Sequence, residues 1–249
     1  MPRYFIKLLY KGTNYSGFQK QDNANSIQAE VEKALKVFFR QDFELTCSSR
    51  TDSGVHAKEN YFHFDCKEPL HLGRAATGHG INSILPEDIS IRKIFMVSDT
   101  AHCRFDPISR TYCYYLYQNK EPFLQDRAYY YPFKIKLSAL QQAAAEIINH
   151  KDFTSFSKRN TQVKTFNCQI YESEWVEENG YFVYKVRGNR FLRGMVRGLV
   201  GTMLHMGRGK ISLEDFKAII NARDCTKADF SVPPQGLFLM EVRFSPHIE

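Results

Sequence analysis

The sequence of 249 residues contains no long hydrophobic run. No stretch approaches the roughly 18–20 consecutive apolar residues that a membrane-spanning helix needs. The N-terminal stretch alternates like a strand and carries Arg3 and Lys7, so it lacks the apolar segment of a secretory signal. The hydrophobic content of 43% is too high for a disordered chain. We therefore expect a soluble, globular, cytoplasmic protein.

The cysteines are scattered along the chain, and no pair has the spacing Cys-x-x-Cys. The six cysteines are Cys47, Cys66, Cys103, Cys113, Cys168 and Cys225. This spacing argues against a zinc ribbon and against a dense disulfide framework. We expect reduced thiols, most of them packed inside the protein.

The chain has fewer acidic than basic residues. The chain has 34 Lys and Arg against 27 Asp and Glu, which gives a formal net charge of +7. Such a surplus suits a polyanionic partner such as nucleic acid, because Lys and Arg attract phosphates and release their counterions. Many basic proteins bind no nucleic acid, so the charge alone is weak evidence for a nucleic-acid partner.

Hydrophobic periodicity predicts strands and helices in two similar passes. The first pass has expected strands over 4–10, 43–48, 60–66 and 89–97, and helices beginning at 25 or 26 and covering 72–85. The second has expected strands over 110–119, 168–176, 181–186 and 237–244, and helices beginning at 138, covering 191–206 and following 212. Ser138 and Gln141 have capping-box spacing, and Asn179-Gly180 indicates a tight hairpin.

The two passes lack the regular βαβα rhythm of a doubly wound sheet. They favour an α+β fold with two related α/β halves, a largely antiparallel, mixed sheet and helices packed on one face. We place the halves at residues 1–104 and 105–249, although no Pro- or Gly-rich linker marks the boundary.

A predicted loop around Asp52 has the composition of a reactive site. Arg50, Asp52, two hydroxyl residues beside the acid and Gly54 follow one another after a predicted strand. Such a loop can hold an exposed carboxylate rigidly among hydroxyls and backbone N–H groups. Spacing alone favours a simpler interpretation, an Asx-turn in which Asp52 bonds its own backbone ahead of Gly54.

A second stretch combines basic and aromatic side chains. Along the strand after Arg110, Tyr112 and Tyr114 alternate to one face, and Tyr115 and Tyr117 to the other. A basic residue beside an aromatic face can hold an unstacked base and its phosphate. For Tyr115 and Tyr117 we favour burial in the core.

The last long helical pattern contains Gly194, Gly198 and Gly201, each costing about 1 kcal/mol relative to Ala. Close approach of another backbone or of a ligand would offset this loss. Arg193 and Arg197 lie one predicted turn apart beside the apolar stripe. A buried guanidinium needs a carboxylate or phosphate partner, whereas either side chain could instead extend into solvent.

Taken together and in this order, these stretches resemble the tRNA pseudouridine synthase family of the TruA type over nearly the whole chain. The matching motifs are Tyr10-Lys-Gly-Thr-Asn-Tyr-Ser-Gly-Phe-Gln-Lys-Gln21, Ser26-Ile-Gln28, Arg50-Thr-Asp-Ser-Gly-Val-His-Ala57, Asn82-Ser-Ile-Leu-Pro-Glu-Asp-Ile89, Arg110-Thr-Tyr-Cys-Tyr114, Asp152-Phe-Thr-Ser-Phe156, Phe191-Leu192, Met195-Val-Arg197 and Pro233-Pro-Gln-Gly-Leu237. A lone Arg-Thr-Asp-x-Gly would be a weak match, whereas the ordered set is specific.

The resemblance implies isomerisation of uridine to pseudouridine at positions 38, 39 and 40 in the anticodon stem-loop of tRNA, by a homodimer whose shared clefts hold the tRNA. It implies these site residues: Asp52 as nucleophile, Tyr112 and Arg197 as catalytic partners, Leu237 as a base contact, Arg50 as the group that displaces the target base, and Arg110, Phe18, Gln19 and Arg193 as further RNA contacts. Phe18 stands where Trp is common in the family, and Ser53 where Ala is common.

This chemistry breaks the N1–C1′ bond, turns the uracil and forms a C5–C1′ bond, without net redox change, so we expect neither a cofactor nor a metal. The carboxylate can attack C1′, attack C6 or promote loss of the 2′ proton, and each route requires an ionised group close to the base. A nearby Arg favours that charged form, and a tyrosine can stack on the uracil and relay a proton. The base must first leave the helix.

Two other function classes fit parts of the sequence. A non-catalytic RNA-binding protein would use the same basic and aromatic surfaces, but it would gain nothing from Asp52, whose carboxylate repels phosphate. A metal-dependent nuclease could be built from His56, His63, Asp65 and Cys66, although no recognisable ligand spacing accompanies them.

Overall fold

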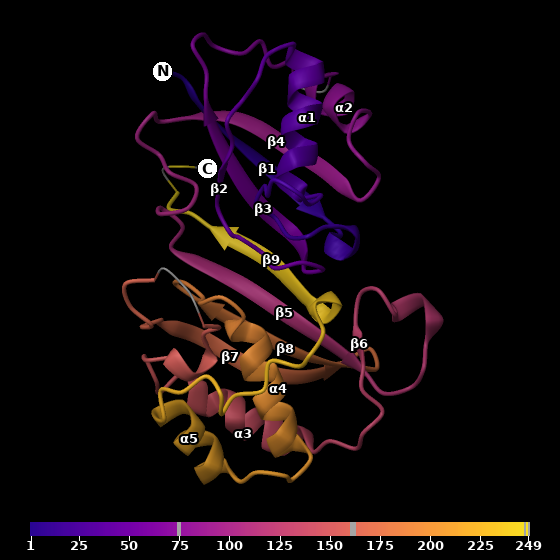
Figure 1. Ribbon diagram of the computed structural model, residues 1–249, viewed down its shortest axis with the longest axis vertical. Helices are drawn as coiled ribbons and strands as arrows, with labels where there is room; N and C mark the ends of the chain where they lie inside the picture. Colours follow the sequence, from indigo (N-terminus) through magenta and orange to yellow (C-terminus); the bar gives the residue numbers. More distant parts are fainter. Residues whose placement is uncertain (74–75, 160–162, 247, 249) are drawn as a thin grey trace. The chain divides into compact units, whose positions relative to one another are not determined.

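The computed structural model describes residues 1–73, 76–159, 163–246 and 248, and its ribbon is drawn in Figure 1. The chain forms two compact units. The first contains Met1–Ile108 together with Leu239–Glu249, and the second contains Ser109–Phe238. Each unit is a set of residues that contact one another more than they contact the rest of the chain. The sequence-based division into 1–104 and 105–249 stays a prediction.

The first unit is built on an antiparallel sheet. Its central strand β1 (Arg3–Tyr10) pairs with β4 (Ile89–Val97) on one side and with β3 (His56–Asp65) on the other. The short strand β2 (Thr46–Cys47) also pairs with β3, and β9 (Leu237–Arg243) follows β3 in the strand order.

Two helices accompany this sheet, α1 (Ile27–Phe39) and α2 (Ala76–Asn82). The Ser26 side chain accepts a hydrogen bond from the backbone N–H of Ala29 and caps α1, and the helix ends before Arg40, which is left-handed with φ 57°. The apolar stripe that contains Val31 and Leu35 is buried. The capping residue and the stripe confirm the predicted start of this helix.

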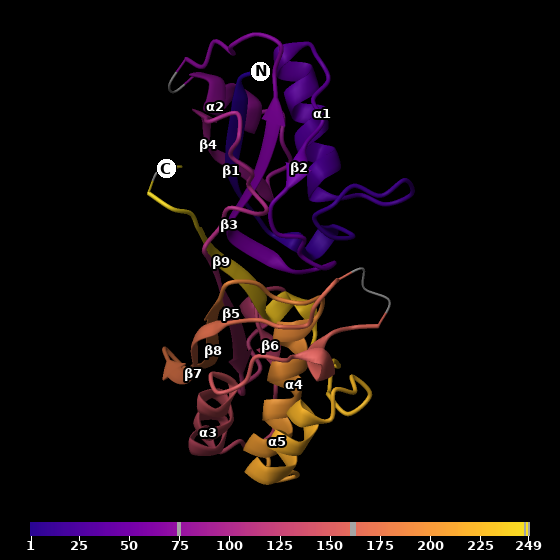
Figure 2. The same ribbon diagram turned by 90° about the vertical axis from the view of Figure 1, so that its left-hand side faces the viewer.

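The second unit has the strand order β5-β8-β7, all antiparallel: β5 (Ser109–Tyr117), β8 (Tyr181–Gly188) and β7 (Ile170–Glu178). A short strand, β6 (Tyr129–Tyr130), pairs parallel with β5. Three helices, α3 (Leu137–Ile147), α4 (Met195–Gly207) and α5 (Leu213–Asn221), pack against one another, as Figures 1 and 2 show. The described residues also form four 3₁₀ turns: Gly12–Asn14, Pro122–Leu124, Thr154–Phe156 and Pro234–Gly236.

This architecture confirms the α+β class, with strands that are mostly antiparallel and with β5 and β6 as a parallel pair. The hairpin at Asn179-Gly180 is also confirmed, because both residues are left-handed, with φ 51° and 79°, as a type I′ turn requires. Ser212 and Asp215 form a capping box at the start of α5. In the described part of the chain, no helix is both long enough and apolar enough to span a membrane.

Two helix starts differ from their predictions. The capping box expected at Ser138 is wrong, because α3 already begins at Leu137 after Lys136, whose backbone N–H donates to the carbonyl of Gly207. This contact with a distant segment fixes the helix start. The helix expected over 191–206 begins only at Met195, because Gly194 is left-handed with φ 75°. Arg193 and Arg197 therefore do not share a helical face.

Three further boundaries differ from the prediction. The strand expected over 43–48 is only Thr46–Cys47, and the strand expected from residue 60 begins at His56. The helix expected over 72–85 is shorter, Ala76–Asn82, and residues 74 and 75 lie outside the described residues.

Two glycines of α4 allow the ring of Phe230 and the backbone of Asp229 to approach the helix closely. A Cβ atom at Gly198 would lie 2.7 Å from the ring of Phe230, and one at Gly201 would lie 2.2 Å from the carbonyl oxygen of Asp229. Thr202 reinforces this contact, since its hydroxyl accepts a hydrogen bond from the backbone N–H of Asp229 at 3.0 Å. The close approach expected from the glycine pattern is therefore made by residues 229–230.

Replacing Gly201 by Ala should destabilise the protein by about 1–3 kcal/mol, because the backbone of Asp229 cannot move away without breaking its bond to Thr202. Gly78→Ala in α2 is the matched control, because a Cβ there meets nothing within 4 Å. The control should gain up to about 1 kcal/mol from helix propensity. Urea unfolding of both variants measures the difference, and equal stability of the two would contradict this packing.

Candidate active site

In the first unit, Asp52 opens a tight turn between β2 and β3. The backbone N–H of Val55 donates to the carbonyl of Asp52 at 3.2 Å, and Gly54 is left-handed with φ 76°. Glycine adopts this conformation without strain. The main chain closes the turn, and Asp52 is half-buried beside the exposed Ser53.

The residues on both sides of Asp52 are fastened to other segments. The carbonyl of Thr51 accepts from the backbone N–H of Phe18 at 3.1 Å, and the Thr51 hydroxyl hydrogen-bonds the phenol of Tyr10 at 2.7 Å. On the other side, the Ser53 hydroxyl donates to the carbonyl of Tyr15 at 3.0 Å. The carboxylate therefore stands on a short piece of main chain with little freedom to move.

Two glycines let the 3₁₀ turn at Gly12–Asn14 and the segment after it approach this loop. A Cβ at Gly12 would lie 2.0 Å from the carbonyl oxygen of Val55, and Gly17, with φ 110°, lies against the carbonyl of Thr51. His56 is buried, and its Nδ1 accepts from the backbone N–H of Gly12 at 3.0 Å. In this structure His56 therefore holds the loop.

The predicted RNA contacts in this unit separate into two kinds. Arg50 and Gln19 are exposed next to the fastened loop residues. Phe18 is fully buried, with its ring stacked on Phe62 at 4.4 Å between centroids and on Tyr10 at 5.3 Å. Its ring supports the loop from within the core, and this position leaves no ring surface for RNA.

In the second unit, Tyr112 lies on β5, opposite Val186 of β8. Its ring packs edge-on against Phe191, with centroids 5.0 Å apart and an interplanar angle of 78°. Two residues earlier on the strand, Arg110 donates from Nη1 to the carbonyl of Asn189 at 3.1 Å. The motif containing Arg110 and Tyr112 therefore packs on the segment that leads into α4.

Arg197 lies in the first turn of α4, and its partners are main-chain carbonyls. Its Nε donates to the carbonyl of Val232 at 2.8 Å, and its Nη2 to that of Phe230 at 3.4 Å. The sequence suggested a carboxylate, a phosphate or solvent as partner. These carbonyls accept hydrogen bonds from two of the guanidinium nitrogens. Because a carbonyl carries no formal negative charge, neither contact neutralises the positive charge of Arg197.

A second anchor holds the segment that ends at Leu237, the first residue of β9. The phenol of Tyr114 donates to the carbonyl of Pro233 at 2.6 Å, and burial raises the pKa of Tyr114 far above its usual range, so the donor proton is retained. A Cβ at Gly236 would lie 2.7 Å from the Tyr114 ring. Arg197 and Tyr114 thus fix the path of the chain toward Leu237.

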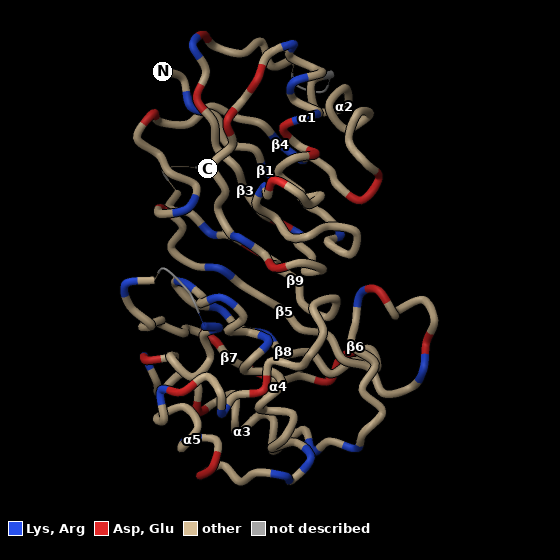
Figure 3. The backbone as a smooth tube through the Cα atoms, in the orientation of Figure 1, with Lys and Arg blue, Asp and Glu red and all other residues tan. Residues whose placement is uncertain are grey.

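Basic residues gather in the loops that precede α4. Figure 3 shows Lys and Arg segments in these loops, which carry Lys158, Arg159, Arg190 and Arg193. Arg193 is exposed, and its carbonyl accepts from the backbone N–H of Lys158 at 3.0 Å. This surface of the second unit suits a phosphate backbone.

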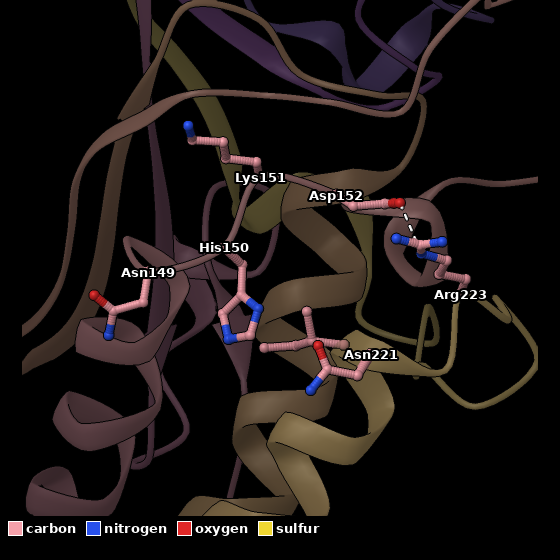
Figure 4. A pocket seen from close by; sticks show the side chains of 7 residues that line it. Asn149, His150, Lys151, Asp152, Asn221 and Arg223 are labelled. Carbon is pink, nitrogen blue, oxygen red and sulfur yellow. Dashed lines mark ion pairs between the residues drawn. The ribbon is translucent and has the colours of Figure 1, made fainter.

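A pocket in the second unit contains none of the predicted site residues. It is lined by residues that include His150, Asp152 and Arg223 (Figure 4). Arg223 forms an ion pair with Asp152 at 2.9 Å, and Asp152 also accepts from Thr154. Asp152, which belongs to one of the matching motifs, therefore stabilises a turn.

Sequence reasoning missed the residues that support the Asp52 loop. The side-chain amide of Asn60 bonds both the N–H and the carbonyl of Ser49, and it also donates to Tyr10. Asn is uncommon inside strands, so a polar amide within the pattern of β3 is the signal that could have indicated this role.

The side chains considered for a metal site have other partners. Nδ1 of His63 lies 3.2 Å from the Sγ of Cys103, and Asp65 forms a two-bond ion pair with Arg3. Within residues 1–73, 76–159, 163–246 and 248, no group of three or more His, Cys, Asp or Glu residues is arranged to hold a metal ion.

Comparison with known proteins identifies the class. The family model described as tRNA pseudouridine synthase matches residues 7–106 and 143–245, which is more than half of the chain. The chain therefore belongs to the tRNA pseudouridine synthase family. It is an enzyme, an isomerase that makes pseudouridine in tRNA.

Three relatives named tRNA pseudouridine synthase A illustrate the similarity. The protein of Bacteroides fragilis is 44% identical over 99% of this chain and 98% of its own length. That of Parabacteroides distasonis is 41% identical over 98% and 96%. That of Staphylococcus carnosus is 35% identical over 98% and 91%. The family resemblance stated from the motifs is confirmed.

Below about pH 6.5 the wild-type protein should lose stability through His63. Burial lowers the pKa of His63 to about 4, so between pH 4 and 6.5 the unfolded chain binds more protons than the folded one. The stabilisation is complete above the unfolded pKa and is lost as the pH falls toward 4, by about 1–2 kcal/mol.

His63→Asn should be less stable at pH 7.5 but should show a flatter dependence of stability on pH. Urea unfolding at pH 7.5, 6 and 5 measures both proteins. Parallel curves for the two proteins would mean that His63 does not carry the effect.

Proposed function

We propose that this enzyme isomerises uridine at positions 38, 39 and 40 in the anticodon stem-loop of tRNA, with Asp52 as the nucleophile acting on a flipped-out base. The observation that carries the proposal is the fixed main chain on either side of Asp52, where Thr51 and Ser53 are both hydrogen-bonded to other segments. A binding protein has no use for a rigidly presented carboxylate, because that charge repels phosphate.

Asp52 serves the reaction as an ionised carboxylate close to the ribose and the uracil. Attack on C1′, attack on C6 and loss of the 2′ proton all meet this requirement. The family resemblance assigns Arg197 the role of favouring the charged form of this carboxylate. Tyr112 stacks on the uracil and relays the proton lost during the rearrangement.

The proposed contacts with RNA come from the exposed side chains of Arg50, Gln19 and Arg193, the half-buried Arg110 and the largely buried Leu237. Arg50, two residues before Asp52, takes the place of the target base in the stem. Gln19, Arg110 and Arg193 bind the surrounding backbone, and Leu237 contacts the base. Phe18 leaves this set, because its ring is enclosed by Tyr10 and Phe62.

The proposal also includes the oligomeric state of the enzyme and its place in the cell. The family resemblance favours a homodimer with shared tRNA clefts, working in the cytoplasm, where tRNA is present. The excess of Lys and Arg, with a net charge of +7, supports binding of a polyanion.

Asp52→Asn should reduce turnover about 10³-fold or more, because the amide keeps the shape of the side chain but cannot act as a nucleophile. Binding of tRNA should stay within roughly threefold. Tritium release from 5-tritiated uridine in tRNA measures turnover, and filter binding measures affinity.

Asp42→Asn is the matched control, because Asp42 is exposed and forms a surface ion pair with Lys36. It should turn over tRNA like the wild type. Near wild-type turnover in Asp52→Asn would contradict the nucleophile assignment.

In cells that lack this protein, pseudouridine should disappear from positions 38, 39 and 40 of tRNA and remain at other positions. Mapping pseudouridine across the tRNA pool measures this change. Restoration by the wild-type gene, but not by the Asp52→Asn gene, assigns the loss to this site. Loss at a different tRNA position would replace the proposed specificity.

A further inference from the structure

A chain of buried hydrogen bonds connects the interior of the first unit to the loop that carries Asp52. The chain runs from the Asn60 amide to the Tyr10 phenol and on to the Thr51 hydroxyl. We propose that Tyr10 and Asn60 are positioning residues that hold the main chain beside Asp52 in its reactive place. This inference rests on the proposed role of Asp52 as nucleophile.

Asn60 holds Ser49 with two hydrogen bonds. Its Oδ1 accepts from the backbone N–H of Ser49 at 3.2 Å, and its Nδ2 donates to the carbonyl of Ser49 at 2.8 Å. The amide thus bonds both polar groups of one residue, as a neighbouring strand would. Asn60 is fully buried, so these contacts also satisfy polar atoms that water cannot reach.

Tyr10 carries this support two residues further. Its phenol oxygen lies 3.1 Å from Nδ2 of Asn60 and 2.7 Å from Oγ1 of Thr51. Thr51 is buried, and the next residue is Asp52. The phenol therefore fixes the last side chain before the carboxylate.

A β-bulge places Tyr10 and Asn60 at the loop that carries Asp52. In the β1–β3 pairing, Leu8 lies opposite Asn60 but Tyr10 lies opposite Ala57, so the register shifts by one residue between them. Bulges re-aim side chains and are common beside active sites. Here the irregular stretch of β3 contains Asn60 and the residues that follow the Asp52 turn.

Positioning explains features that stability alone leaves unexplained. A Leu or Val at residue 60 would suit a buried strand better than an amide, yet it could not hold Ser49. A displacement of about 1 Å at a reacting group can cost roughly 10²-fold in rate. Loss of these bonds should therefore act on catalysis more than on RNA affinity.

Two nearly isosteric variants remove opposite ends of one hydrogen bond. Tyr10→Phe lacks the phenol oxygen, and Thr51→Val lacks the hydroxyl that bonds it. Each should lower kcat about 10- to 100-fold while KM for tRNA changes by less than about threefold. The double variant should be no slower than the slower single variant, because both changes remove the same contact.

Tyr4→Phe is the matched control. Tyr4 lies on the same strand and the same face, is also buried, and its phenol oxygen accepts one bond, from the backbone N–H of Leu70 at 2.9 Å. The control should lower the melting temperature by an amount similar to Tyr10→Phe and leave kcat unchanged. If Tyr10→Phe fails to fold, Thr51→Val alone carries the test.

Wild-type kcat in the folded variants, multiplicative effects in the double variant, or an equal loss of kcat in Tyr4→Phe would overturn the positioning role. Asp52→Asn, measured beside them, separates the two proposals. If Asp52→Asn is inactive while Tyr10→Phe and Thr51→Val turn over normally, only the positioning role fails. If Asp52→Asn is active, the proposed function itself fails.

Discussion

The hydrogen bond between Tyr10 and Thr51 connects the core of the first unit to its candidate chemistry. A carboxylate on a mobile loop would be solvated by water and would spend little time in any single orientation. Here Thr51 is held through its hydroxyl and its carbonyl, and Ser53 is held through its hydroxyl. Such support from outside the reacting groups maintains the geometry of a catalytic residue.

The second unit applies the same principle with different groups. Arg197 and Tyr114 donate to carbonyls of residues 230–233, and Gly201 of α4 lets the backbone of Asp229 lie directly against the helix. The route of the chain to Leu237 is therefore fixed by side chains of the family motifs. Several of these motif residues thus hold main chain in place, whatever contact they also make with RNA.

Particular positions show how far the sequence could be interpreted. The strand predicted over 89–97 coincides with β4, and Asn179-Gly180 located the hairpin, because both depend on neighbouring residues. The start of α4 was placed too early, because the apolar stripe continues through residues that precede the helix and a single left-handed glycine decides where the helix begins. Phe18 was expected at the RNA, but its ring is closed into the core by residues distant in sequence.

The family, the α+β class and the candidate nucleophile Asp52 could all be inferred from the residues alone, because ordered motifs and local periodicity lie along the chain. The groups that support Asp52 could be identified only in the folded protein. Tyr10 and Thr51 are 41 residues apart, and Arg197 and Val232 are 35 apart. No local pattern encodes such pairs, because they form only when separate segments pack together and each buried polar atom must find a partner.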